Sequence, residues 1–120
     1  MSTPGYQDLE VWKRAVDLTV SIYEACNKLP NTELYAIADQ MKRAAVSIPS
    51  NIAEGQKRFG AKDALQFCNI ALGSLAELET QLIIVKKVYK IDIDKILDEC
   101  EIISRMLHAL TKSLRAKNDS

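Results

Sequence analysis

The sequence predicts an all-α protein, a single domain over residues 1–120 that folds as an antiparallel up-down-up-down four-helix bundle. Apolar residues recur every three or four positions along four segments, as they do on one face of an α-helix. The breaks between the segments hold only a few residues, so consecutive helices must run in opposite directions. The chain has 120 residues, 48% of them hydrophobic, with four Gly and three Pro. That composition is sufficient for one hydrophobic core.

The first helix is predicted over about residues 8–28, and its apolar surface is unusually wide. Two adjacent stripes follow helical spacing: Leu9, Trp12, Val16, Thr19, Tyr23 and Cys26 in one, and Val11, Ala15, Leu18, Ile22 and Ala25 in the other. A single bundle buries only part of such a surface. We therefore expect the chain to form a homo-oligomer.

The second helix is predicted over about residues 32–58, with Asn31 or Thr32 as its N-cap. Its apolar stripe consists of Leu34, Ala38, Met41, Ala45, Ile48 and Ile52. Pro49 removes the amide that would bond to the Ala45 carbonyl, so we expect a kink near this residue. Because the apolar phase runs on to Ile52 without a slip, we expect a continuous helix. A break into two helices at residues 47–50 is the alternative.

The last two helices are predicted over about residues 61–88 and 93–117, after a turn at Phe59-Gly60. The third helix carries the stripe Ala64, Cys68, Ala71, Leu75, Leu78, Leu82 and Val85. The fourth carries Ile93, Ile96, Cys100, Ile103, Leu107, Leu110 and Leu114. Helices of these lengths span about 30–40 Å each.

Charge and cysteine usage limit the possible functions. The 16 Lys and Arg residues balance the 16 Asp and Glu residues, so no overall positive field attracts phosphates. The three Cys residues fall within helical patterns and form no Cys-x-x-Cys pair, which predicts buried thiols in a reducing cytosol and no metal site. The longest uncharged stretch of the third helix, residues 64–76, is too short to cross a bilayer. We expect a cytoplasmic protein without membrane contact.

The sequence offers no template for catalysis. Its only histidine, His108, has Arg105 three positions earlier, so the Glu-x-x-His motifs of di-iron bundles are missing. Two residues separate Arg105 from His108, which is too few for the helical-bundle ribonucleases that use an Arg followed four to six positions later by a His. No Gly-rich phosphate loop occurs. We expect no enzymatic activity and no cofactor.

Polar stripes on the second and third helices are the unusual feature of this sequence. The second helix carries Gln40, Arg43, Ser47, Asn51, Glu54 and Arg58, and the third carries Gln66, Asn69, Gly73, Glu77, Thr80 and Gln81, with Glu79 one step round. Short hydrogen-bonding residues are less typical of a solvated face than Lys and Glu. We expect a packed polar contact in which Arg43 or Arg58 pairs with a Glu, within the bundle or between subunits. A solvated face is the alternative. The candidate assembly residues are Asn51, Glu54, Gly55, Glu77, Glu79 and Gln81.

Basic residues flank Pro49 and form the candidate nucleic-acid-binding set: Lys42, Arg43, Lys57 and Arg58. Arg43 and Lys57 share one face of the helix about 21 Å apart, a distance that spans several phosphates. Because Arg43 and Arg58 lie on the polar stripe, Lys42 and Lys57 are the better candidates for phosphate contact. A solvated basic face is again the alternative.

Residues 43–55, RAAVSIPSNIAEG, resemble the signature of four-helix-bundle proteins encoded in intervening sequences of bacterial 23S ribosomal RNA genes. The resemblance continues in residues 9–12 and 73–82 and extends over residues 6–114; it departs at Ala36, where related proteins usually carry Gly. It implies a bundle assembled as a homopentamer. It also links the chain to the accessory variability protein of diversity-generating retroelements, a similar pentamer that binds nucleic acid and a reverse transcriptase.

Two functions therefore remain open. The first is a non-enzymatic oligomer that binds RNA or another nucleic acid, alone or with a nucleic-acid-processing protein. The second is a protein-interaction scaffold in which the motif residues serve only homo-oligomer assembly. Local basic charge and the resemblance favour the first function. Zero net charge and the lack of an aromatic stacking platform in the sequence favour the second.

Overall fold

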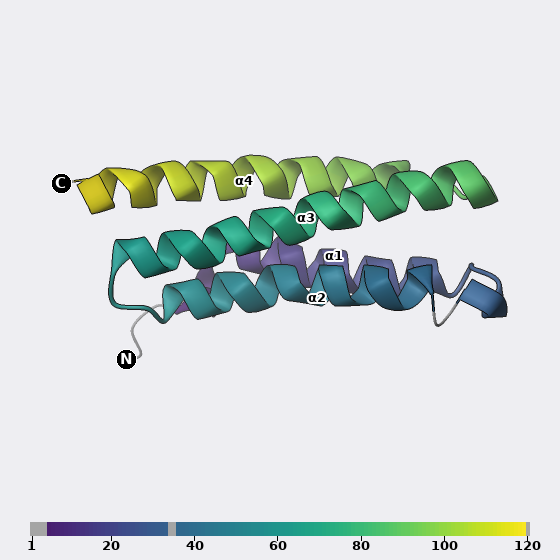
Figure 1. Cartoon of the computed structure of the whole chain (residues 1–120), viewed down its shortest axis with the longest axis horizontal. Coiled ribbons are helices and arrows are strands. Elements are labelled where there is room, and N and C mark those ends of the chain that lie inside the picture. The colour runs from purple at the N-terminus through teal and green to yellow at the C-terminus, as the bar shows by residue number, and fades with distance from the viewer. Residues whose placement is uncertain (1–4, 34–35, 120) are drawn as a thin grey trace.

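The computed structural model describes residues 5–33 and 36–119, which form four α-helices, two short 3-10 helices and no strand. The α-helices are α1 (Glu10–Cys26), α2 (Ile37–Gln56), α3 (Ala61–Tyr89) and α4 (Asp94–Asp119), and the 3-10 helices are Tyr6–Asp8 and Asn31–Glu33. Successive helices alternate in direction, and both α1 and α3 pack against α2 and α4 (Figure 1). The predicted all-α four-helix bundle is confirmed.

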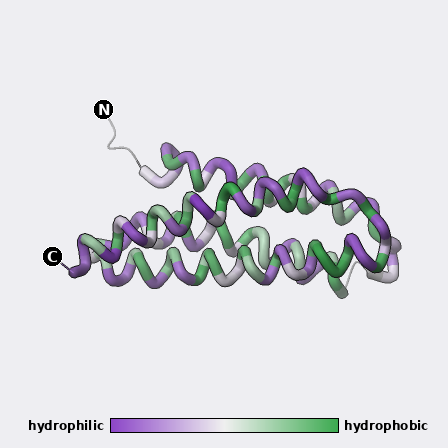
Figure 2. The backbone as a smooth tube through the Cα atoms, turned by 90° about the horizontal axis from the view of Figure 1, so that it is seen from above, coloured by the Kyte–Doolittle hydropathy of each residue, from purple (hydrophilic) through white to green (hydrophobic). Residues whose placement is uncertain are grey.

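One hydrophobic core runs through the bundle and contains most residues of the predicted stripes. Hydrophobic and hydrophilic residues alternate along each helix with the helical period (Figure 2). All seven stripe residues of α3 are buried, as are Met41, Ala45, Ile48 and Ile52 of α2. Each fully buried Leu or Ile side chain stabilises the fold by about 1.5–3 kcal/mol.

The two apolar stripes of α1 have different environments. Val11, Ala15, Leu18 and Ile22, from the second stripe, are buried in the core. In the first stripe only Cys26 is buried, and Tyr23 is 45% exposed. Val20, next to that stripe, is 52% exposed. The subunit therefore covers only part of the apolar surface of this helix.

Helix α2 is continuous through Pro49, which is buried in its interior. Residues 47–50 are all helical. Continuity of this helix is therefore confirmed, and the alternative of two helices is wrong. The kink near Pro49 stays a prediction.

The predicted start of the second helix is wrong by five residues. Helix α2 begins at Ile37, and the expected caps Asn31 and Thr32 belong to the separate 3-10 helix instead. Residue spacing cannot distinguish a 3-10 helix from an α-helix, because both place residues three positions apart on nearly the same side. Leu29, only 6% exposed, holds the connection against the core before that turn. Leu34, the first predicted stripe residue, lies outside the described residues.

Helix α3 is long and apolar enough by composition to cross a membrane. Its position in the bundle gives another reason for this composition. The helix packs against both α2 and α4, and residues such as Leu75, Leu78 and Leu82 are buried between them. A helix covered on two sides needs a wide apolar surface.

Candidate nucleic-acid interface

The two candidate lysines, Lys42 within α2 and Lys57 at the C-cap of that helix, both reach toward α1 and the segment before it. Lys42 Nζ lies 5.0 Å from the centre of the Tyr23 ring, and Lys57 Nζ lies 5.8 Å from the centre of the Tyr6 ring. Both distances fit a cation–π contact. Within residues 5–33 and 36–119, neither lysine pairs with a carboxylate. Both ammonium groups therefore keep an uncompensated charge on the same side of α2.

The two candidate arginines, by contrast, are paired with acids one turn earlier on α2. Arg58 Nη2 lies 2.9 Å from Glu54 Oε2, and its guanidinium lies 4.7 Å from the centre of the Phe67 ring on α3. Arg43 Nε lies 3.0 Å from Asp39 Oδ2, and the Arg43 side chain is 81% exposed. Exposed pairs of this kind contribute less than about 1 kcal/mol. Arg58 thus pairs with a Glu, whereas Arg43 pairs with an Asp outside the predicted stripe.

Three short polar side chains meet at the centre of the α2–α3 contact. The hydroxyl oxygens of Ser47 and Ser74 lie 2.7 Å apart in a hydrogen bond. The amide of Asn51 donates to the Ser47 carbonyl oxygen at 2.8 Å and to its hydroxyl at 2.9 Å. These bonds join the two segments that carry the polar stripes within one subunit.

Gly55 lets α2 and α3 approach closely near their turn. A Cβ at this position would lie 3.2 Å from Phe67 Cβ and 3.3 Å from the Ala64 carbonyl oxygen. Gly73 is different, because a Cβ there would have no neighbour within 4 Å among the described residues. Close backbone approach therefore explains the glycine at position 55, and nothing in the subunit requires the one at 73.

The other candidate assembly residues lie apart from this contact. Gln81 Nε2 donates to Glu77 Oε1 at 3.3 Å, whereas the buried Gln81 Oε1 has no hydrogen-bond partner in the described structure. Glu79 lies nearer α4, where burial and then the Glu101 carboxylate raise its pKa above the ordinary value of 4.5. The six candidates therefore do not form one hydrogen-bond network within the subunit. Among residues 5–33 and 36–119, no three His, Cys, Asp or Glu side chains are grouped as metal ligands.

The comparison with protein families decides the family of the chain. The sequence profile of the family described as 23S rRNA-intervening sequence protein matches residues 7–109, which include α1, α2, α3 and most of α4. The chain belongs to this family. No curated protein matches the sequence.

All ten candidate residues of this member of the 23S rRNA-intervening sequence protein family lie within the matched range. So do the two segments, residues 43–55 and 73–82, on which the resemblance rested. The structure joins those segments directly through the hydrogen bond between Ser47 and Ser74. In this chain, the two segments that carry the resemblance therefore form a helix–helix contact.

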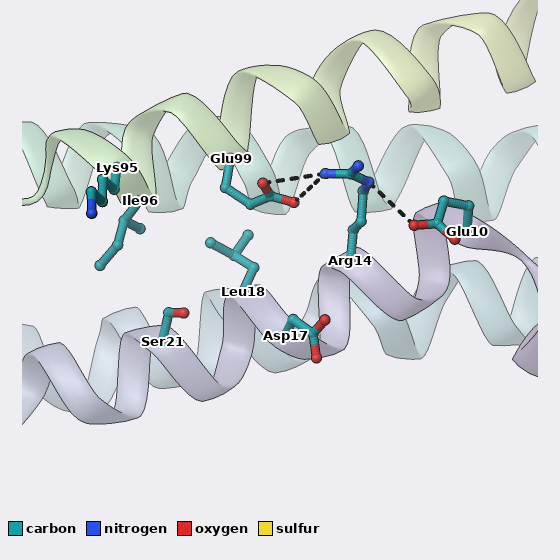
Figure 3. A pocket seen from close by; sticks show the side chains of 8 residues that line it. All are labelled: Glu10, Arg14, Asp17, Leu18, Ser21, Lys95, Ile96 and Glu99. Atoms are coloured by element: carbon teal, nitrogen blue, oxygen red, sulfur yellow. Dashed lines mark hydrogen bonds and ion pairs between the residues drawn. The ribbon is translucent and has the colours of Figure 1, made fainter.

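A groove of about 500 Å³ lies between α1 and α4, on another side of this family member (Figure 3). Arg14 Nη1 donates to Glu99 Oε1 at 3.1 Å, and Arg14 Nε lies 3.4 Å from Glu10 Oε1 without hydrogen-bond geometry. Two carboxylates thus surround one guanidinium. The ion pair between Arg14 and Glu99 joins α1 to α4. Because carboxylates surround the guanidinium, the groove does not favour the binding of a phosphate.

The fold also gathers aromatic residues that are far apart in the sequence. The α2–α3 turn lies at the same end of the bundle as the start of α1 and the end of α4 (Figure 1). At this end Phe59 is completely exposed, and the Tyr6 ring stands edge-on to Trp12 with 5.3 Å between centres. Phe67 lies under Arg58 nearby. The sequence analysis did not predict this aromatic group. The sequence feature that could have indicated it is a Phe between Arg58 and a Gly at a turn.

Proposed function

We propose that this protein is a non-enzymatic homo-oligomer, a pentamer by its family resemblance, that binds nucleic acid, and RNA above all, through basic residues in α2 and at its C-cap. The observation that supports this function best is the pair Lys42 and Lys57. Both lack a carboxylate partner in the described structure and extend to the same side of the helix. Fifteen residues separate them by about 22 Å, which corresponds to about six phosphates of one strand.

Assembly would compensate for the neutral net charge of one chain. Rotational symmetry repeats Lys42 and Lys57 around a ring, so a pentamer carries about ten such lysines on equivalent surfaces. Arg43 and Arg58 add little to this field, because each is already paired with an acid. A fivefold ring of all four candidate cations would carry about twenty charges, so the pairing of the arginines leaves about half of them.

Exposed apolar residues support the oligomer. One group, Val20, Tyr23 and Val46, lies on α1 and α2; another, Ile70, Ile83, Ile84 and Val88, lies on α3. A closed ring brings two different surfaces of neighbouring subunits together. Two separate apolar groups meet that requirement. Light scattering at micromolar concentration should return a multiple of the single-chain mass, and the single-chain mass itself would contradict the proposal.

Charge reversal tests the RNA surface. The double variant Lys42→Glu, Lys57→Glu should lower RNA affinity at least about tenfold and reduce the slope of affinity against salt by about two per site. The matched control, Lys87→Glu with Lys95→Glu, makes the same change in net charge with two exposed lysines of α3 and α4. Equal RNA affinity in both double variants would reject Lys42 and Lys57 as the contact.

A protein-interaction scaffold is the second candidate function. The observation that favours it is that hydrogen bonds join Asn51 to Ser47 and Ser47 to Ser74 within the subunit. These side chains therefore serve helix packing and offer no contact to a nucleic acid. On this reading the exposed apolar groups would bind a protein partner, such as a nucleic-acid-processing enzyme. If the assembled wild-type protein retains no RNA even at low salt, the result favours the scaffold.

A further inference from the structure

We infer that the α2–α3 turn is a stacking contact for the bases of single-stranded nucleic acid, with Phe59 as the stacking residue. The inference rests on the proposed nucleic-acid binding and adds a strand type and a position to it. Phe59 is completely exposed, so folding gains nothing from its ring. Burying the apolar surface of a Phe side chain is favourable, and here that free energy remains available to a ligand.

Basic residues adjoin Phe59 in the sequence, and two of them lie over other aromatic rings. Lys57 and Arg58 precede Phe59 directly, and Lys62 follows it in the first turn of α3. Lys57 Nζ lies 5.8 Å from the centre of the Tyr6 ring. Exposed rings that alternate with cations suit a single strand, since bases stack on the rings while phosphates meet the cations.

Two hollows flank the turn and match this use. One, of about 330 Å³, is lined by Tyr6, Gln56 and Lys57. The other, of about 290 Å³, is lined in part by Arg58 and Phe59. These volumes lie near the lower end of small-ligand pockets, about 300–1,000 Å³, and suit one nucleotide each. The Gln56 amide, which borders both hollows, offers a donor and an acceptor to a base edge.

The exposed ring favours a single strand over a duplex. In a double helix the faces of the bases are covered by their neighbours, so a protruding Phe has no base face to contact. In a single strand each base has a free face, and stacking on an aromatic side chain tolerates any sequence. The contact should therefore discriminate strand type more than base identity.

The test compares a short oligouridine with an abasic sugar-phosphate chain of equal length and charge, each titrated into the full-length assembled protein. Wild type should bind oligouridine about tenfold more tightly than the abasic chain. Phe59→Ala should lower oligouridine affinity to the abasic level and leave abasic binding unchanged. Phe59→Trp should retain the preference, and Phe59→Leu should lose it. His108→Ala, which truncates an exposed ring of α4, is the matched control and should bind like wild type.

Several results would overturn the stacking contact. If Phe59→Ala binds oligouridine like wild type while the Lys42 and Lys57 reversal weakens binding, the stacking contact is wrong and the proposed function stands. Full preference in Phe59→Leu would indicate a non-stacking apolar contact. A change of oligomer size in Phe59→Ala would assign the ring to a contact between copies. If wild type binds neither oligomer, the proposed function fails together with this inference.

Discussion

Ser47 and Ser74, 27 positions apart, share a hydrogen bond of 2.7 Å across the contact between α2 and α3. Each residue belongs to one of the two segments on which the family resemblance rested. Asn51 donates to Ser47 from one turn further along α2, so Ser47 interacts with both helices. The bond fixes the rotation and the height of α2 against α3, because a shift by one residue would separate the hydroxyls.

A double-mutant cycle should detect this bond. Ser47→Ala and Ser74→Ala should each lower the free energy of unfolding by about 1 kcal/mol. The double variant should lose less than the sum of the two, because each single substitution removes the same hydrogen bond. Denaturant titrations at equal protein concentration give the values. Strictly additive losses would mean that the two hydroxyls do not stabilise each other.

The two glycines of the signature segments should respond oppositely to alanine. Gly55→Ala should destabilise by about 1–3 kcal/mol, because the new methyl would press on the Ala64 carbonyl and Phe67 Cβ, neither of which moves easily. Gly73→Ala should stabilise by up to about 1 kcal/mol, since alanine favours a helix interior and meets no neighbour in the subunit. Chemical unfolding of both variants measures this. A shift of both in the same direction would contradict the assigned packing.

Glu79→Gln should stabilise the protein near neutral pH. Burial and the Glu101 carboxylate raise the pKa of Glu79 when the chain folds, so the native state binds this proton more tightly than the unfolded state. Stability from this group is therefore lost as pH rises from below 4.5 through the folded pKa. The substitution should raise Tm by about 1–3 °C at pH 7 and leave it nearly unchanged below that range.

Glu54→Gln is the matched control for that pH effect. It also removes one carboxylate, but Glu54 is exposed and paired with Arg58, so its loss should not raise Tm at neutral pH. Thermal unfolding of both variants at pH 7 and below pH 4.5 measures this difference in Tm. An increase in Tm of equal size at both pH values would show that Glu79→Gln acts through packing rather than charge.

The three cysteines should be unreactive in the native protein. Burial raises the pKa of Cys68 to about 11, and burial together with Glu79 and Glu99 raises that of Cys100 to about 12; the pKa of Cys26 is raised as well. The reactive thiolate is therefore scarce at pH 8. A colorimetric thiol reagent should detect almost none before denaturant is added and three per chain afterwards. A thiol that reacts at once in native protein would refute this burial.

The number of helices, most of the core residues and the family followed from the sequence alone. Residues such as Leu75, Leu78 and Leu82 recur with the helical period, and a period of this kind depends only on local geometry, so it survives without knowledge of any neighbour. Continuity through Pro49 followed for the same reason, since the apolar phase did not slip. The family followed from long ordered motifs.

Only the tertiary structure decided which side chains meet. The rotation of each helix against its neighbour places Lys42 over Tyr23 and Lys57 over Tyr6. The same rotation brings Glu79 near Glu101. A single-helix pattern leaves that rotation open whenever polar and apolar stripes adjoin. The aromatic residues at the α2–α3 turn were likewise hidden, because antiparallel packing brings the chain start beside that turn. The late start of α2 depended on a connection held by burial, which spacing does not encode.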